Sequence, residues 1–515
     1  MKKFIFFLTI SSIIAGLSAG VVSCSNNLDE PQKAAYLPAN LDEKAGTWKT
    51  YVLATPTDVA VAEPKAINSA EYQAEVTSLK GQTQNLTSDQ RDAVAYWGAG
   101  AAFRWNEIAR ELCARYNIPP ASTPDGKYPV PDAANPLADP KFPFSNPPYS
   151  SRALAYLSVA QYDALVSAWY YKYKYNRVAP AQTDAALKPL LPVSTLPSYP
   201  SEDAVVAAAS AVILKAMFPG EVPYLDAKLA EHRNSRLWAG MNVESDLAAG
   251  EALGNAVAAK VMGRARTDGM SAANNQTVTA GMIQAAKDRG LTDVWVSQET
   301  PARPPMLPNF GAVTTWNFDK ATLIKLRPGP PPALNSDGYQ NDITELRQIN
   351  KSQTRDQARI ANYWSDGAGS YTPPGHWHRA AANAAHDFQY SEVRMARTLA
   401  LVGTAMMDAG IGCWDAKYFY YYPRPQQFGV KTSVGLPNFP SYPSGHSTFS
   451  AAASTVLSAI FPSKADDFAA EASEASVSRI YGLIHYRFDS GAGLEHGTKI
   501  GSYAVERAKA DGSGL

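Results

Sequence analysis

The feature that most restricts the fold of this chain is the spacing of its apolar residues, which follows a helical period over most of its length. Apolar side chains recur at intervals of three and four along 89–116 and again along 152–173. No stretch alternates apolar and polar residues in the way that a half-buried strand does. The sequence therefore predicts an all-α protein built of helical bundles in two packed layers.

A proline-rich segment divides the expected helices into two groups. Before it, Ser201 followed by two acidic residues is typical of an N-cap and first turn, and helical patterns recur at 223–232 and 243–261. Residues 301–332 contain eight prolines and no helical run, which marks a soft boundary. After it, helices are expected at 341–364, 380–414, 447–461, 464–484 and 491–509.

The chain therefore divides into five expected regions. With 45% hydrophobic residues it can bury one large core or two adjoining ones. Residues 25–88 lack a sustained helical period, which predicts a flexible tether followed by an extended segment. The regions are a signal peptide at 1–23, the tether and extended segment at 24–88, an N-terminal helical region at 89–300, a proline-rich crossing at 301–340 and a C-terminal helical catalytic region at 341–515.

The N-terminus has the pattern of a secretory signal. Two lysines follow Met1, and an apolar run then extends over 4–22. The run ends in Val-Val-Ser-Cys24, which resembles the lipobox of bacterial lipoproteins, and Ser25 resembles the outer-membrane sorting pattern. The resemblance implies export and a membrane attachment through lipid on Cys24 alone. An ordinary cleaved signal with a chance cysteine is the alternative.

Charge and cysteine content exclude some partners and leave other questions open. Lys plus Arg equals Asp plus Glu at 47 each, so the molecule has no overall electrostatic attraction to nucleic acid. Besides Cys24, the chain has only Cys113 and Cys413. They either pair in the oxidising envelope or remain as buried free thiols, and the sequence does not decide between the two. It does not indicate the oligomeric state either.

Three short segments in the C-terminal half carry residues suited to binding an anion. In the first, Lys417 lies seven residues before Arg424, which Pro423 and Pro425 hold in a non-helical turn. Taken alone, such a pair is most often a solvated basic edge. A charged site is indicated only if other segments converge on it.

The second segment places Ser444, Gly445 and His446 directly before an Ala-rich helical run. The start of a helix presents unpaired backbone N–H groups and the positive end of the helix dipole, and both favour an oxyanion. The alternative is a capped helix start with a surface histidine.

The third segment contains Arg479, His485 and Asp489. Because Asp489 lies four residues after His485, the two side chains are expected to meet on one helical face. The carboxylate would then fix the imidazole tautomer and leave the opposite nitrogen free as a nucleophile or ligand. Alone, such a pair is more often structural. Together the three segments predict a receptor for one small oxyanion, with three cations, amide donors and two histidines around it.

These motifs resemble a known superfamily. Lys-x6-Arg-Pro, then Pro-Ser-Gly-His, then Ser-Arg-x5-His-x3-Asp, in this order, is similar to the signature of vanadium-dependent haloperoxidases and type 2 phosphatidic acid phosphatases. Trp-Ser-Asp-Gly at 364–367 and Pro-Pro-Gly-His-Trp at 373–377 look like the bacterial haloperoxidases, and 104–107 gives a weaker match. The resemblance implies the helical-bundle fold of this superfamily.

The resemblance also implies roles for individual residues. His485 would be the vanadate ligand or, in a phosphatase, the nucleophile, Asp489 would orient it, and His446 would be the acid–base partner. Lys417 would also polarise bound peroxide. The equatorial oxygens would be held by Lys417, Arg424, Ser444, Gly445 and Arg479. Trp414 and Phe439 match positions on the halide side of chloroperoxidases, although they could equally be ordinary aromatic core.

Three functions follow from this, in order of preference. The first is a vanadate-dependent haloperoxidase that oxidises halide with hydrogen peroxide to hypohalous acid. The second is a soluble envelope acid phosphatase that hydrolyses phosphomonoesters through a phosphohistidine, since vanadate mimics the transition state of phosphoryl transfer. The third is a non-catalytic surface-binding lipoprotein. The halide and the organic acceptor are not predicted.

The remaining histidines receive no catalytic role. His376 and His378 form a His-x-His pair without a third metal ligand nearby in sequence, so a structural or pocket-lining role is favoured. Asp366 is expected to orient a basic residue of the site. The histidines treated as structural are His232, His386 and His496.

Overall fold

The computed structural model describes residues 33–129, 135–139 and 141–515, and over these residues it contains helices and no strand. The predicted signal peptide and Cys24 lie outside the described residues and stay predictions. The all-α prediction is confirmed. The α-helices are α1 (Ala70–Gln82), α2 (Ser88–Trp97), α3 (Ala101–Tyr116), α4 (Pro147–Tyr175), α5 (Pro180–Thr183), α6 (Glu202–Met217), α7 (Val222–Trp238), α8 (Glu244–Ala265), α9 (Thr279–Asp288), α10 (Lys320–Leu326), α11 (Asp337–Ser352), α12 (Arg355–Tyr363), α13 (Thr372–Asp387), α14 (Glu392–Tyr420), α15 (Gly445–Ile460), α16 (Ala465–Tyr481) and α17 (Arg487–Lys509).

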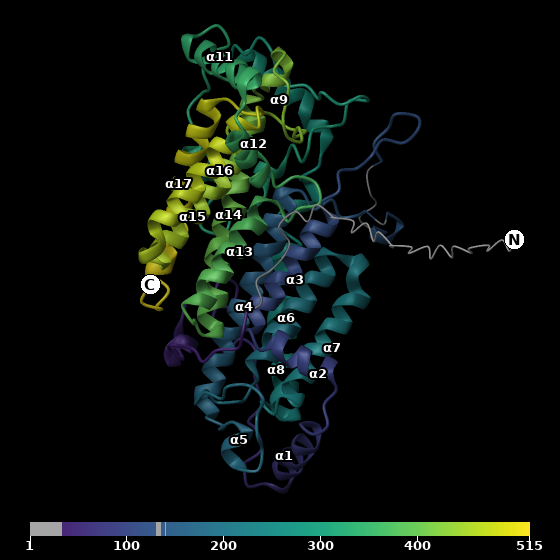
Figure 1. Cartoon of the computed structure of the whole chain (residues 1–515), viewed down its shortest axis with the longest axis vertical. Helices are drawn as coiled ribbons and strands as arrows, with labels where there is room; N and C mark the ends of the chain where they lie inside the picture. Colours follow the sequence, from purple (N-terminus) through teal and green to yellow (C-terminus); the bar gives the residue numbers. More distant parts are fainter. Residues whose placement is uncertain (1–32, 130–134, 140) are drawn as a thin grey trace, which may run out of the picture.

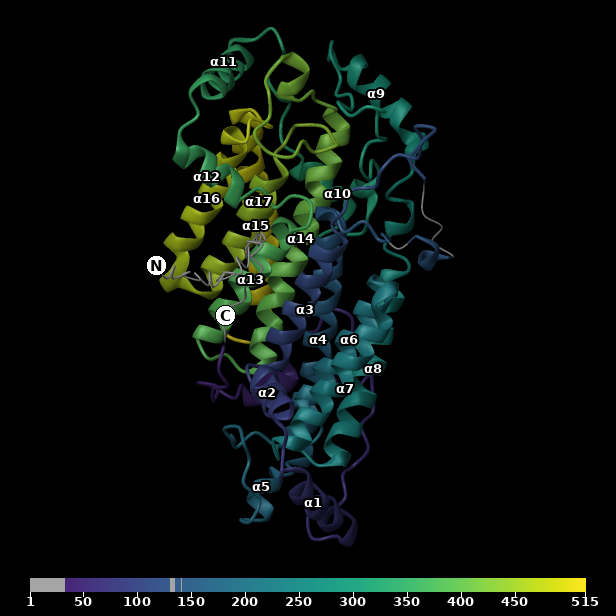
Figure 2. The same cartoon turned by 45° about the vertical axis from the view of Figure 1, so that its right-hand side comes forward.

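Two long helices form the centre of the molecule. α4 and α14 have 29 residues each and pack along one another. α6 and α8 pack on α4, whereas α15 and α17 pack on α14, so two helical layers meet at the central pair (Figure 1). Turning the molecule by 45° keeps the same division between N-terminal and C-terminal helices (Figure 2). The largest core cluster contains buried residues from both groups.

The close approach of α15 and α17 positions the site. Gly493 of α17 faces the start of α15, and a methyl group on it would lie 2.7 Å from the carbonyl oxygen of Ser444. One turn later, a methyl group on Gly497 would collide with the carbonyl oxygen of Thr448. The absence of side chains lets the two backbones touch. The Ser-Gly-His turn therefore lies beside the first two turns of α17, and Ser444 N donates a hydrogen bond to Asp489 O.

Several expected helices differ from those in the structure. The stretch at 89–116 is two helices, because Gly100 has a φ of 116° that a right-handed helix does not allow. The stretch at 341–364 is also two helices, since Thr354 caps α12 with a reciprocal bond to Gln357. The stretch at 380–414 is divided where Gln389 adopts a φ of 52°, and the helix that follows continues to Tyr420. In each case the apolar period continues across the break.

Two segments expected to lack helices contain them. α1 lies in the segment predicted as extended, where Ser69 caps its first turn by accepting a hydrogen bond from Tyr72 N. α10 lies between the prolines of the crossing, and Asp319 caps it. In both helices the cap satisfies end donors that would otherwise lack partners, and α1 also buries Tyr72, Val76 and Leu79 on one face.

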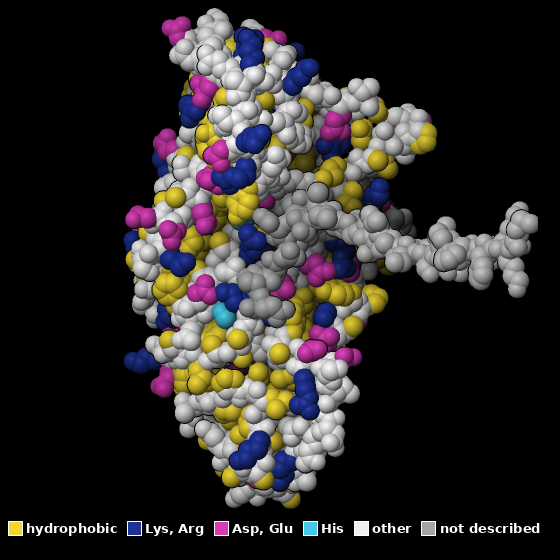
Figure 3. All heavy atoms as spheres, in the orientation of Figure 1, with side chains coloured by type: hydrophobic (Ala, Val, Ile, Leu, Met, Phe, Trp, Pro, Cys, Tyr) yellow, Lys and Arg dark blue, Asp and Glu magenta, His cyan; other side chains and the backbone are white. Residues whose placement is uncertain are grey.

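The described surface carries charges of both signs, and Cys113 and Cys413 are both buried. On the face drawn in Figure 3, basic and acidic side chains are interspersed over the upper and middle parts of the molecule. Within the described residues, no helix combines the length and apolar character needed to cross a bilayer. Cys113 and Cys413 are both buried free thiols, so of the two alternatives the structure has the unpaired one.

Candidate active site

The histidine–carboxylate pair of the third segment lies at the start of α17. His485 Nδ1 is 2.8 Å from Asp489 Oδ2, and Asp489 also accepts a hydrogen bond from the backbone N–H of Tyr486 at 3.2 Å. The two side chains meet as expected, but not on a shared helical face, because His485 precedes the helix and Asp489 lies in its first turn. Leu483, with a φ of 62°, ends the preceding helical segment. The contact leaves His485 Nε2 as the ring nitrogen not engaged by Asp489.

Ser441 is a member of this group that the sequence interpretation missed. Its Oγ donates to Asp489 Oδ2 at 2.5 Å and is 3.3 Å from His485 Nδ1. Its only sequence signal is its place in the Pro-Ser-Tyr-Pro-Ser run before His446. The hydroxyl fixes the carboxylate, which in turn fixes the ring.

Lys417 is fully buried near the end of α14, and its ammonium group faces the turn before α15. Its Nζ donates to the carbonyl oxygens of Pro440, Ser441 and Pro443 at 2.5–3.0 Å. These three bonds use all three ammonium protons. Lys417 therefore holds the backbone of the turn while contributing positive charge, rather than directing a proton into the cavity. Burial lowers the pKa of its ammonium to about 8.

The two arginines reach the same place from different elements. Arg424 is buried, donates from Nε to Phe439 O and from Nη1 to Ile484 O, and keeps a buried Nη2 without a hydrogen-bond partner. Arg479, at the end of α16, donates to Ser478 Oγ and Ala361 O at 2.9 Å. Burial lowers the pKa of each guanidinium to about 10. Within the described part of the chain, neither arginine nor Lys417 forms an ion pair with a carboxylate.

The electrostatic consequence is an excess of buried positive charge around His485. Burial, followed by the charges of Arg424 and Lys417, lowers the pKa of its imidazole well below the usual value. Burial also raises the pKa of Asp489. Asp489 and Asp366 offset part of this charge without forming an ion pair with any of the three cations, and an anion that binds among the cations lowers the cost of burying them further. This charge pattern favours the binding of a small anion.

His446 lies in the first turn of α15 and lines the same cavity as His485. Its Nε2 is buried without a hydrogen-bond partner, and burial together with Arg479 lowers the pKa of its ring to about 3. The ring is therefore neutral at pH 7. Asp366 lies near it and is 3.4 Å from His376 Nδ1, and His376 stacks on Trp364. Asp366 was expected to orient a basic residue, and in the structure its nearest basic partner is His376.

A cavity of about 190 Å³ contains part of the predicted set. Of the predicted residues, it is lined by Gly445, His446, Arg479, His485, Trp414 and Phe439. Lys417, Arg424, Ser444 and Asp489 do not line it and lie behind its wall. Ser444 caps α15 by accepting from Ser447 N, so its hydroxyl oxygen serves the helix start. The ten predicted residues therefore form one group, in which six line the cavity and four lie behind them.

The aromatic wall of the cavity is held by the proline-rich crossing. Trp414 and Phe439 pack with ring centroids 4.9 Å apart, and Trp414 Nε1 donates to Met306 O. Arg303 and Asn438 also line the cavity, and the sequence interpretation missed both. Asn438 Nδ2 donates to the carbonyl oxygen of Pro304, which attaches the motif turn to the crossing.

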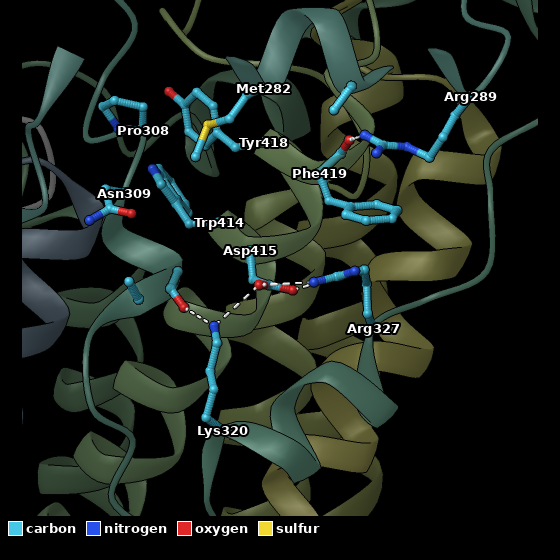
Figure 4. A pocket seen from close by; sticks show the side chains of 13 residues that line it. Met282, Arg289, Pro308, Asn309, Lys320, Arg327, Trp414, Asp415, Tyr418 and Phe419 are labelled. Carbon is cyan, nitrogen blue, oxygen red and sulfur yellow. Dashed lines mark hydrogen bonds and ion pairs between the residues drawn. The ribbon is translucent and has the colours of Figure 1, made fainter. Parts of the chain in front are cut away.

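A second cavity, of about 220 Å³, also has Trp414 in its lining (Figure 4). Arg327 and Lys320 both point at the carboxylate of Asp415, with Arg327 Nε 2.7 Å from it. Arg289 contacts the ring and the carbonyl oxygen of Phe419. Two of its three cations thus already have a counter-charge, in contrast to the cations around His485.

Comparison with known proteins agrees with this geometry. Residues 398–506 match the family model described as the PAP2 superfamily. A bacterial vanadium-dependent iodoperoxidase is similar in structure, with 24% identity, a TM-score of 0.55, and 70% of this chain and 91% of that chain covered. A bacterial vanadium-dependent chloroperoxidase in its holo form gives 13% identity, a TM-score of 0.51, and 75% and 97% coverage. No curated protein matches the sequence significantly. Residues 398–506, which include every motif from Lys417 to Asp489, therefore match the PAP2 superfamily model, and the chain has the helical fold of the vanadium haloperoxidases.

Proposed function

We propose that this protein is a vanadate-dependent haloperoxidase that oxidises halide with hydrogen peroxide. The observation that carries the proposal is the group of three buried cations, Lys417, Arg424 and Arg479, that have no carboxylate partner in the described chain and surround a histidine held by Asp489. The fold, shared with vanadium haloperoxidases, supports it. The unpartnered Nε2 of His446, which lines the cavity, fits a small oxyanion such as vanadate, and the buried guanidinium of Arg424 adds positive charge from behind the wall.

In this proposal each residue acts through its own contacts. His485 Nε2 would hold the anion, while Asp489 and Ser441 keep the histidine ring in place. Arg479 and the start of α15 at Gly445 face the anion, and Lys417 and Arg424 add positive charge from behind the wall. When bound, vanadate supplies a Lewis-acidic centre that activates hydrogen peroxide toward halide.

His446 is proposed to accept and return a proton at its Nε2. Its ring is neutral at pH 7 in the free protein because burial and Arg479 depress its pKa to about 3. An anion in the cavity adds negative charge beside it and raises that pKa, which favours protonation once the ligand is bound. Trp414 and Phe439 supply the apolar wall where a large, weakly hydrated halide can lie.

One assay tests the function. We expect the purified apo-protein to halogenate a dye with hydrogen peroxide and halide only after orthovanadate is added. Phosphomonoester hydrolysis is measured in parallel, because the same oxyanion receptor fits phosphate. Hydrolysis that vanadate inhibits, with no halogenation, would assign the site to a phosphatase instead. The absence of both activities would favour a binding role.

The role of Asp489 can be tested separately from the charge of the site. We expect Asp489→Asn to weaken vanadate affinity by about 10- to 100-fold, because loss of the carboxylate releases the ring and lowers the basicity of Nε2. Titration of the apo-protein with orthovanadate measures this. Ser441→Ala is the matched control, since it removes one hydrogen bond and keeps the carboxylate. Its loss should be clearly smaller, and an equal loss would contradict the assignment.

A further inference from the structure

The chain contains a second copy of the site's framework in its N-terminal half. Pro-Ser-Tyr-Pro-Ser occurs at 197–201 and at 440–444, and each copy is followed by a helix of 16 residues, a Phe-Pro pair and a helix of 17 residues. The constant offset of 243 positions relates Ser235-Arg236 to Ser478-Arg479 and Asp246 to Asp489. α6, α7 and α8 therefore correspond to α15, α16 and α17.

The two copies make equivalent contacts. Lys172 lies three residues before the end of α4, as Lys417 does in α14, and donates to Pro197 O at 2.6 Å. In each copy the aspartate accepts one hydrogen bond from a serine hydroxyl and one from a backbone N–H. The hydroxyl bonds are Ser198 to Asp246 at 3.1 Å and Ser441 to Asp489 at 2.5 Å. The backbone bonds are Val243 N to Asp246 at 3.0 Å and Tyr486 N to Asp489 at 3.2 Å.

The packing that positions the turn is repeated as well. Gly250 of α8 faces the carbonyl oxygen of Ser201, as Gly493 faces that of Ser444, and a methyl group added to Gly250 would lie 2.5 Å from this oxygen. One turn later, a methyl group added to Gly254 would collide with the carbonyl oxygen of Val205. The start of α6 is thus brought against α8 in the way that the start of α15 is brought against α17.

The side chains that would bind an anion differ between the copies. Asp203 stands at the position of His446, and Asn242 at that of His485. Glu202 stands at the position of Gly445. The N-terminal copy therefore lacks both histidines and has gained two carboxylates at the start of its helix.

Glu202 and Asp203, together with Asp246, give the three cations of the N-terminal copy carboxylate partners. Lys172 Nζ is 2.6 Å from Glu202, Arg177 pairs with Asp246, and Arg236 is 3.5 Å from Asp203. Asp203 also lies 3.1 Å from His232 Nε2. Burial would raise the pKa of Asp203, but Arg236 and His232 lower it to about 2, so it is ionised at pH 7. The corresponding cations of the C-terminal copy have no such partners in the described residues.

We propose that the N-terminal copy is an oxyanion cradle closed by the chain's own carboxylates, with Asp203 in the place that an external anion would take. The ligand class of the opened cradle is a small carboxylate or oxyanion, since the cations and the helix start are retained. In the native protein the cradle is a structural ion cluster, and only the C-terminal copy is free to bind an anion. The inference does not depend on which reaction the C-terminal site performs.

Chemical rescue in the full chain tests this. We expect Asp203→Ala to lower the Tm by a few degrees, because Arg236 loses its counter-charge and His232 loses its hydrogen-bond partner. Formate, which matches the removed carboxylate, should restore the Tm in a concentration-dependent way that chloride at equal ionic strength does not. The side chain of Asp203 is 15% exposed, so a small anion can reach the vacated place from solvent.

Asp203→Asn is the matched control, since it removes the charge and keeps the volume. It should lose stability without a formate-specific recovery. A Tm of Asp203→Ala equal to that of the native protein, or an equal response of both variants to formate, would overturn the proposal. If Asp203→Ala does not fold in buffer, its refolding yields in formate and chloride are compared, and equal yields count against the cradle.

Discussion

Replacing His485 with alanine should abolish vanadate-dependent turnover, with a loss of about 10³-fold or more, the upper end for removal of one preorganised group that contacts the anion. The reason is that His485 is the only side chain proposed to bond the centre of the anion, and its ring is held there by Asp489 and Ser441. Isothermal titration with orthovanadate should show the loss of binding, and the dye assay the loss of turnover.

His496→Ala is the matched control for this variant. His496 lies on α17 as well, is equally buried, and burial lowers the pKa of its ring to about 4, but it does not line the cavity. We expect this variant to lose some stability and to keep vanadate affinity per folded molecule. Wild-type vanadate affinity in His485→Ala would show that another group binds the anion.

The helical class and most helix positions were predictable because apolar periodicity reports burial directly. Breaks within long helices were not, because the period passes through them unchanged. Gly100 carried a signal that the interpretation did not use, and Thr354 with Gln357 formed a readable capping box. Gln389 carried none, since glutamine is not typical of a left-handed backbone.

The site shows a similar limit at the level of atoms. The motifs identified residues that the fold brings together. Their spacing alone could not show that the ammonium of Lys417 donates all three of its hydrogen bonds to backbone carbonyl groups. Nor could it show that Asp489 reaches His485 across a turn rather than along a helix. Both follow from the path of the backbone around 440–444. The repeat of Pro-Ser-Tyr-Pro-Ser at 197–201, by contrast, was present in the sequence from the start.

The two copies of the framework provide an internal comparison of what a buried cation does. Arg424 and Arg177 follow equivalent helices, and both are almost inaccessible to solvent. Arg424 has only carbonyl partners, whereas Arg177 pairs with the carboxylate of Asp246. The same residue type is therefore proposed to attract a ligand in one copy and to balance a fixed charge in the other.

Substituting each arginine with methionine, which keeps much of the side-chain length, should produce opposite patterns. We expect Arg424→Met to weaken vanadate affinity about 100-fold or more, as for loss of a preorganised cation. We expect Arg177→Met to leave that affinity intact and to lower the free energy of unfolding by roughly 3–5 kcal/mol, since Asp246 is left buried without its cation. Vanadate titration and urea unfolding of both variants measure the two quantities.

Arg424→Met and Arg177→Met are compared in both stability and vanadate affinity. Arg424→Met loses two hydrogen bonds to carbonyl groups, which lowers the free energy of unfolding. It also removes a buried guanidinium whose pKa burial lowers to about 10, which offsets part of that loss. The free energy of unfolding should therefore fall less in Arg424→Met than in Arg177→Met. If both variants lost stability equally and both kept their vanadate affinity, the positive charge around His485 would be structural. The anion receptor would then have to be sought elsewhere in the molecule.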